Sequence, residues 1–299
     1  MLKDSEVRKN STKAWLLAAR PKTLTGASVP VIIGLAYAWA DMAGEGFNLI
    51  AAVLCMAFAF VMQIDANFVN DYFDFLGGKD DDERLGPPRA CAMGWIDAAR
   101  MRIGILVTTL LACGVGLPLV LYGGIEMIAV GILCVAFCFL YTTFMSSHAM
   151  GDVLVLVFFG IVPVCCTYYL QAGSLSWQVV VASVACGMVV DTLLVVNNYR
   201  DIDNDRRTGK STLIVKVGPA AGRRMYLLLG IVACLSGIHL VFMSHPWAFV
   251  LPLAYLAIHL RTYAKMVRIG SGRQLNSVLA DTVRNMFIYA VAVAAGMLF

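Results

Sequence analysis

Two segments of the sequence carry carboxylate and amide side chains at the spacing of helix turns. Their members, three or four residues apart, are Asn67, Asp71 and Asp74 in the first segment and Asn197, Asp201 and Asp205 in the second. Residues at these spacings share one face of a helix, so each segment predicts a short column of oxygen ligands. Oxygen ligands without histidine or thiolate suit a hard cation, Mg²⁺ above all.

Two such columns facing each other would hold a diphosphate between two Mg²⁺ ions, because Mg²⁺ is commonly shared with substrate phosphates. Cationic side chains follow each column and can bind phosphate oxygens, Arg as a planar fork and Lys as a point charge. The candidates are Arg84 and Arg89 after the first column and Arg200 and Lys210 after the second. The flanking amides Gln63 and Asn198 are further candidates for substrate binding.

A diphosphate that departs from an allylic carbon leaves a carbocation behind. Aromatic faces can stabilise such a cation and exclude water from it. The tyrosines near predicted span ends are Tyr72, Tyr141, Tyr168, Tyr169 and Tyr199. Of these, Tyr141 is placed with Asp71 and Asp201 among the expected catalytic residues.

The elements that must position these residues are membrane-spanning helices. Of the 299 residues, 60% are hydrophobic and 14% are charged, whereas a typical soluble domain has roughly 25% charged residues. A soluble enzyme, a disordered protein and a nucleic-acid-binding module are therefore disfavoured, and an all-α membrane bundle is expected. At about 20 residues per span, the nine predicted spans are 24–43, 47–69, 103–122, 126–145, 152–171, 177–197, 225–243, 247–264 and 279–298.

The basic residues predict the orientation of this bundle. All 23 Lys and Arg residues fall on one side of the nine-span arrangement, and the positive-inside rule makes that side, with the N-terminus, cytoplasmic. We expect a cytoplasmic or interfacial arm over 1–22, with a short surface helix within 3–20. A single bundle over 23–299 follows, and its active-site loops are 70–102 and 198–224.

The two columns are also related to each other by position. Asn67 and Asp71 recur as Asn197 and Asp201, 130 residues further along the chain. This offset corresponds to four predicted spans. It predicts a parallel duplication of a four-helix unit, followed by one additional helix.

With these motifs, the sequence resembles the UbiA-type superfamily of intramembrane aromatic prenyltransferases, which have nine helices and two Asp-rich cytoplasmic motifs. The stretches typical of the branch that acts on 1,4-dihydroxy-2-naphthoate in menaquinone biosynthesis are Arg20-Pro21-Lys22-Thr23, Gly86-Pro87-Pro88-Arg89-Ala90 and Asn197-Asn198-Tyr199-Arg200-Asp201. Matching stretches extend from residue 19 to about residue 218. Two departures are Gly151-Asp152, where Gly-Glu is expected, and Asp65, where a small residue is expected.

The resemblance implies an Mg²⁺-dependent enzyme of the bacterial cytoplasmic membrane. It would transfer a polyprenyl group from polyprenyl diphosphate to 1,4-dihydroxy-2-naphthoate, releasing diphosphate and CO₂ and giving demethylmenaquinol. The column residues would hold the metal and the diphosphate. The implied substrate contacts are Arg84, Arg200 and Lys210 for phosphate and Arg20 or Arg89 for the naphthoate carboxylate. Asp65 and Asp191 are the candidate bases.

Other functions stay open at this point. A sister enzyme of the same superfamily would use 4-hydroxybenzoate or haem as acceptor. A cation transporter also combines repeats with intramembrane acids, but its acids should line a path across the midplane, whereas these columns stop at the cytoplasmic boundary. A CDP-alcohol phosphotransferase is disfavoured because its spaced Asp-Gly and Ala-Arg pattern is absent. The expected partners are the two substrates and membrane lipid, with no nucleic acid.

Overall fold

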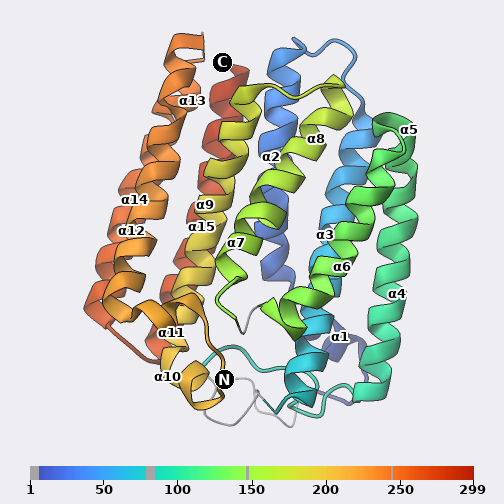
Figure 1. Cartoon of the computed structure of the whole chain (residues 1–299), viewed down its shortest axis with the longest axis vertical. Coiled ribbons are helices and arrows are strands. Elements are labelled where there is room, and N and C mark those ends of the chain that lie inside the picture. The colour runs from blue at the N-terminus through green and yellow to red at the C-terminus, as the bar shows by residue number, and fades with distance from the viewer. Residues whose placement is uncertain (1–6, 79–84, 146–147, 244) are drawn as a thin grey trace.

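The computed structural model of the chain is a bundle of helices (Figure 1) that describes residues 7–78, 85–145, 148–243 and 245–299. None of these residues lies in a strand. Eight of the described helical segments are long and apolar enough to cross a membrane: α2 (Pro21–Asp41), α3 (Leu49–Leu76), Ala98–Gly123, α6 (Glu126–Thr143), Gly151–Ala172, α9 (Trp177–Arg200), Pro219–Met243 and Arg273–Leu298. The expectation of an all-α, multi-pass membrane protein is confirmed.

Four of these spans are built from consecutive helical pieces. They join α4 (Ala98–Gly116) through η2 (Leu117–Leu119) to α5 (Val120–Gly123), α7 (Gly151–Leu156) through η4 (Val157–Ile161) to α8 (Val162–Ala172), α12 (Pro219–Leu235) to η5 (Ser236–Met243), and η6 (Arg273–Leu275) to α15 (Asn276–Leu298). Eight of the nine predicted spans therefore correspond to these eight segments, and one does not.

That span is 247–264, which forms α13 (Trp247–Val250) and α14 (Leu253–Ile269). These helices run alongside α12 and α15 (Figure 1). The 17 residues of α14 fall short of the about 20 that a span needs, and Pro252 separates the two pieces. The count of nine spans and the four-helix duplication therefore stay predictions.

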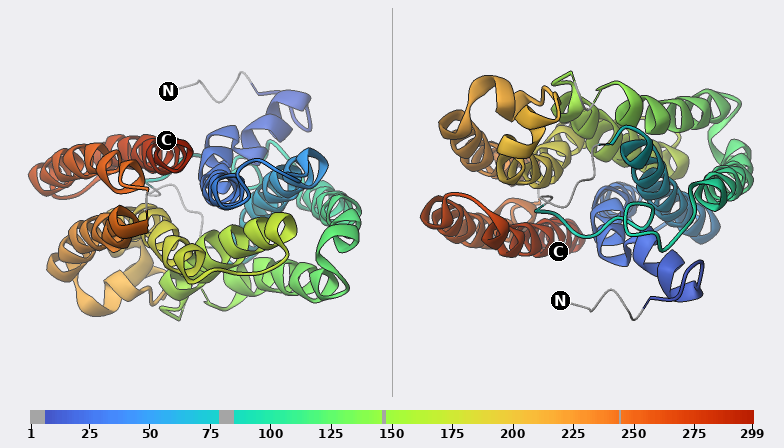
Figure 2. Two further views of the ribbon diagram at one scale, coloured as in Figure 1. Left: turned by 90° about the horizontal axis from the view of Figure 1, so that it is seen from above. Right: turned by 90° about the horizontal axis from the view of Figure 1, so that it is seen from below.

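Helices α2 and α9 form the centre of the bundle (Figure 2). Helix α2 packs against α3, α8 and α15, while α9 packs against α7, α12 and α15. In their most apolar stretches, 61% of the residues of α2 and 67% of those of α9 are buried, against 11% in α6. The outer helices α4 and α6 thus present apolar side chains to the surroundings, as lipid contact requires.

A pair of glycines brings the α7–α8 span close to α9. A Cβ on Gly160 would lie 2.6 Å from the Cα of Gly187 and 2.6 Å from the carbonyl oxygen of Ser183. A Cβ on Gly187 would lie 2.7 Å from the Cδ1 of Leu156. Small residues of this kind let two backbones approach within a membrane. The contact fixes the position of α7 along the axis of α9. Gly160 lies within the π-helical turn η4.

One end of the bundle carries α1 (Thr12–Ala19), α10 (Ile202–Arg207) and α11 (Leu213–Val217), as Figure 1 shows. We call it the basic end, and it is the end that the sequence predicts to be cytoplasmic. The two predicted loops, 70–102 and 198–224, are partly helical. Helix α3 continues to Leu76, and α10 and α11 occupy much of 198–224. Hydropathy marks where the membrane ends, whereas these helices continue beyond it.

The predicted surface helix of the N-terminal arm is α1. The Trp15 ring packs edge-on against Phe68 of α3 at 5.4 Å. Before α1, Lys9 forms an ion pair with Asp97 at 2.6 Å, and the Nδ2 of Asn10 donates to the same carboxylate at 3.0 Å. After α1, Arg20 has a φ of 50°. Its left-handed backbone turns the chain directly from α1 into α2.

Candidate active site

The first column lies on the last three turns of α3. The exposed fractions of Asn67, Asp71 and Asp74 are 4%, 0% and 8%, while that of Phe75 is 41%. The three polar residues therefore share one buried face, as their spacing predicts. The Asn67 Nδ2 donates to the Ala19 carbonyl oxygen and to the Thr23 Oγ1, both at 2.9 Å. This ties the column to the start of α2.

Asp71 holds the chain that follows α3 against the bundle. Its two carboxylate oxygens accept the backbone N–H groups of Ala90 and Cys91, each at 2.8 Å. The Arg20 Nη2 lies 3.8 Å from the Asp71 Oδ2. The sequence predicts a metal ligand here and gives no sign of these amide bonds. Each carboxylate oxygen has a further lone pair, so the ligand role of Asp71 stays a prediction.

Asp74 is paired with a predicted substrate-binding residue. The Arg89 Nη2 lies 3.3 Å from the Asp74 Oδ2, and both residues are buried. A buried ion pair of this kind leaves a costly unpaired charge when one partner is removed. Arg89 thus belongs to the first column. The other predicted cation of this loop, Arg84, lies outside the described residues.

Arg200 binds the second column directly. Its Nε and Nη2 donate to the two oxygens of Asp201 at 2.8 and 2.5 Å, and Nη2 also donates to the Asn197 Oδ1 at 2.9 Å. Its Nη1 donates to the Asn276 Oδ1 at 2.7 Å. The Asn276 Nδ2 in turn donates to the Leu85 carbonyl oxygen at 2.9 Å. Asn276, at the start of α15, therefore joins the second column to the chain that follows the first.

Asp205, the last member of the second column, lies in α10. It is buried, and its Oδ2 has no hydrogen-bond partner among the described residues. Burial raises the pKa of Asp205 to about 6; nearby Lys210 opposes this rise, and the charges of Asp201 and Asp74 add to it. The charge of Asp74 acts on Asp205, and the arrangement of the two columns around a metal stays a prediction. Asp203 is off this face, with its side chain 89% exposed.

The columns do not form a ready-made metal cluster. In the part of the chain that the structure describes, no three His, Cys, Asp or Glu side chains are close enough to hold a metal ion. Arg89 and Arg200 instead pair with Asp74 and Asp201. The donor set is nevertheless all oxygen, and the unpartnered Asp205 Oδ2 lies within it. These features fit Mg²⁺, which prefers oxygen ligands and few protein carboxylates.

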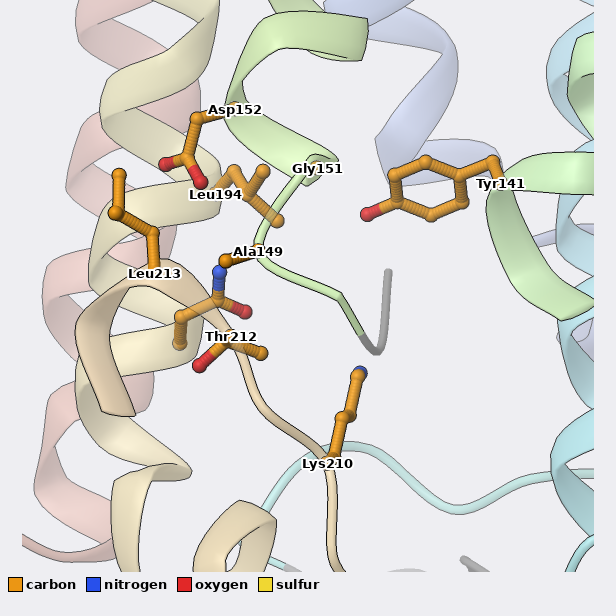
Figure 3. A pocket seen from close by; sticks show the side chains of 9 residues that line it. Tyr141, Ala149, Gly151, Asp152, Leu194, Lys210, Thr212 and Leu213 are labelled. Atoms are coloured by element: carbon orange, nitrogen blue, oxygen red, sulfur yellow. The ribbon is translucent and has the colours of Figure 1, made fainter. Parts of the chain in front are cut away.

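Three further predicted residues, Tyr141, Asn198 and Lys210, line one pocket at the basic end. We call it the Tyr141 pocket. Figure 3 shows the Tyr141 hydroxyl and the Lys210 amine pointing into the space between α6 and α7. Asp152, in the first turn of α7, also lines the pocket. It was not predicted as a site residue, and its one signal in the sequence is the Gly151-Asp152 pair.

Other candidates have structural partners away from this pocket. Asp65 accepts the hydroxyls of Thr108 and Thr109 of α4 at 2.5 and 3.0 Å, so it bonds to α4. Tyr168 donates to Asp41 at 2.6 Å, at the end of the bundle opposite the columns.

Two predicted residues stay near the columns. The Tyr199 hydroxyl donates to the Gly270 carbonyl oxygen at 2.7 Å and pins the loop before α15. The Gln63 Nε2 lies 3.4 Å from the Asn67 Oδ1. Gln63 therefore contacts the first column at its membrane side.

Comparison with known proteins completes this description. A model of the UbiA prenyltransferase family matches residues 27–291. The chain belongs to the UbiA prenyltransferase family. It is 35% identical to the 1,4-dihydroxy-2-naphthoate octaprenyltransferase of Escherichia coli over 84% of both chains. It is 36% identical to the protein of the same name from Mycobacterium tuberculosis, over 95% of this chain and 97% of that one.

The fold of this UbiA prenyltransferase is found in distant solved structures. A UbiA homolog from Aeropyrum pernix superposes with a TM-score of 0.68 at 16% identity, covering 91% of this chain and 97% of that one. A UbiA homolog from Archaeoglobus fulgidus, bound to GPP and Mg²⁺, superposes with a TM-score of 0.67 at 14% identity, covering 96% and 100%. The expected UbiA-type fold is confirmed.

Proposed function

We propose that this prenyltransferase joins a polyprenyl group to 1,4-dihydroxy-2-naphthoate in the bacterial cytoplasmic membrane, with release of diphosphate and CO₂ and formation of demethylmenaquinol. The observation that supports the proposal is the presence of two carboxylate columns at the basic end, where Asp74 acts electrostatically on Asp205. The names of the bacterial relatives support the naphthoate acceptor. The apolar helices behind the columns provide the environment for a polyprenyl tail.

Mg²⁺ would be held by the two columns, as two ions that share the diphosphate. The proposed ligands are Asn67, Asp71, Asp74, Asn197, Asp201 and Asp205. When bound, the metal neutralises the negative charge that develops on the departing diphosphate. The ligand bound to the Archaeoglobus fulgidus homolog, GPP with Mg²⁺, supports this use of the site.

The cationic side chains have a second task in this proposal. Arg89 and Arg200 pair with column carboxylates, and they can donate to phosphate oxygens once those carboxylates bind metal. Lys210 lies close enough to Asp205 to influence it electrostatically, so it can reach the same phosphates. Preorganised donors of this kind stabilise a leaving group where its charge appears. Tyr141 presents a ring and a hydroxyl beside the reacting carbon.

The test uses purified protein, Mg²⁺, an allylic polyprenyl diphosphate and 1,4-dihydroxy-2-naphthoate labelled in its carboxyl group. Labelled CO₂ should be released only when Mg²⁺ and the diphosphate are both present. Asp205→Ala should abolish release, whereas Asp203→Ala, on the exposed face, should leave it unchanged. Prenylation of 4-hydroxybenzoate without any CO₂ release from the naphthoate would show that the chain is a sister enzyme with a different acceptor. Inactivity on every acceptor would overturn the proposal.

A further inference from the structure

The Tyr141 pocket contains a buried carboxylate that the reaction at the columns does not use. Asp152 is 8% exposed, and its Oδ1 has no hydrogen-bond partner among the described residues. A buried acceptor without a donor destabilises a fold, so a donor from a ligand or from water is expected at such a group. The predicted metal ligands do not line this pocket.

The remaining walls of the pocket have complementary chemistry. Tyr141 and Lys210 point into the space from the side of α6 and from the turn before α11, while Asp152 extends from α7 over Leu194 (Figure 3). Leu194 and Leu213 provide apolar contact. The pocket is open to the outside, and its space of about 220 Å³ between the lining atoms includes that open mouth.

The pocket also lies at the correct place for a second substrate. Lys210 lines it and acts electrostatically on Asp205 of the second column. Asp74 and Asp205 both lie within electrostatic reach of Tyr141. A molecule in the pocket would therefore lie at the same end of the bundle as a diphosphate held by the columns, within electrostatic reach of Asp205.

We infer that the Tyr141 pocket binds the aromatic acceptor as a hydroxylated aromatic carboxylate, with Asp152 accepting a hydrogen bond from a ring hydroxyl and Lys210 pairing with the carboxylate. The inference rests on the proposed function and assigns its acceptor subsite. Opposite charges at Asp152 and Lys210 fix which way round the ring lies, because Asp152 repels the carboxylate end. Arg20 and Arg89, the residues implied by sequence for that carboxylate, are paired with Asp71 and Asp74.

The test measures binding, not turnover. Calorimetry under reducing conditions would titrate 1,4-dihydroxy-2-naphthoate and a polyprenyl diphosphate separately into the detergent-solubilised chain. Asp152→Asn should weaken naphthoate binding about tenfold or more and change diphosphate binding less than twofold. Asp281→Asn is the matched control, because Asp281 forms an ion pair with Lys265 away from the pocket, and it should change neither. Unchanged naphthoate binding in Asp152→Asn would overturn the inference.

A second comparison is insensitive to partial unfolding of the variant. The wild-type chain should bind 2-naphthoate, which lacks both hydroxyls, about tenfold more weakly than the dihydroxy compound. Asp152→Leu, whose side chain has no acceptor, should bind the two compounds about equally, because the ring hydroxyl then loses its partner at residue 152. Undiminished discrimination in the variant would contradict the assignment.

Failure of the inference and of the proposed function can be told apart. Suppose that labelled CO₂ is released, but that the preference for the dihydroxy compound over 2-naphthoate does not depend on Asp152. This result would support the proposed reaction and show that the acceptor binds outside the Tyr141 pocket. Absence of CO₂ release, with Asp152-dependent discrimination between 4-hydroxybenzoate and benzoate, would support the acceptor subsite and show that its acceptor is not the naphthoate. If the wild-type chain binds none of these acids, the subsite assignment is wrong.

Discussion

At the scale of single residues, Asp71 does two things at once. It belongs to the first column, and it also accepts the N–H groups of Ala90 and Cys91. Those amides directly follow Arg89, which pairs with Asp74 of the same column. Any change at Asp71 therefore alters both the column and the position of Arg89.

This double role makes Asp71→Asn a specific test. The amide places an NH₂ group against a backbone N–H donor, so one buried hydrogen bond is lost, at a cost of about 1–3 kcal/mol in unfolding free energy. Thermal melting in detergent and hydrogen exchange at Ala90 and Cys91 would measure the loss, and activity should fall at least tenfold. Asp203→Asn is the control. Wild-type exchange protection at Ala90 and Cys91 in Asp71→Asn would show that these bonds do not hold the segment.

At the scale of helices, the contact between α9 and the α7–α8 span depends on the absence of side chains. Gly160→Ala would place a methyl group 2.6 Å from the Gly187 Cα. Overpacking of this kind costs about 1–3 kcal/mol. Gly131→Ala, in α6, has no atom within 4 Å of its new Cβ and should be neutral or slightly stabilising because alanine favours helix. Equal melting temperatures for the two variants would contradict this account of the helix contact.

The N-terminal arm is attached in part through the carboxylate of Asp97, which Lys9 and Asn10 contact. Hydrogen bonds from Lys9 and Asn10 lower the pKa of Asp97. A carboxylate with a lowered pKa stabilises the attached state above its ordinary value of 3.8 and loses that contribution as pH falls through the lowered value. The arm should therefore stay attached at all pH values above about 4.

Asp97→Asn should weaken the attachment of the arm at neutral pH, as protonation of Asp97 is expected to do in the wild-type chain. Limited trypsin digestion would follow it, because Lys13 and Arg20 become accessible when α1 leaves α3. Asp281→Asn would serve as a carboxylate control that leaves the arm in place. If Asp97→Asn is cut no faster than the wild-type chain, the Asp97 contacts do not hold the arm.

Sequence reasoning predicts helices better than it predicts what their side chains contact. Hydropathy and charge locate the spans, and the spacing of Asn67, Asp71 and Asp74 correctly places them on one buried face. The amide bonds to Asp71 involve backbone groups, which leave no pattern of side-chain types. Asp152 was missed for a related reason: its pocket is formed by α6, α7, α9 and the turn before α11, and no spacing along one helix brings these together.

At the scale of the whole molecule, one side chain connects the two halves of the site. Asn276 accepts from Arg200 and donates to the Leu85 carbonyl oxygen, so α15 holds both column loops. Asn276→Ala should lower activity about tenfold and weaken Mg²⁺ binding, since Arg200 loses one of its buried partners and a charge-assisted hydrogen bond contributes about 1.5–3 kcal/mol. Turnover and Mg²⁺ titration would measure both effects.

Ser277→Ala provides the adjacent control, because the Ser277 hydroxyl bonds only within its own turn, to the Gln274 carbonyl oxygen, in the contacts described. It should change neither quantity. Normal Mg²⁺ binding together with normal turnover in Asn276→Ala would show that the two loops are held independently of α15.

The packing of α15 on α2 has a consequence for biosynthesis. The ribosome makes α2 first among the spans and α15 last, so α2 waits in the membrane for its partner through almost the whole of translation. Asn276 arrives with α15, after both columns have been made. The nascent chain therefore carries all six column residues long before they can be joined, and a product of premature termination before α15 would insert into the membrane without a completed site.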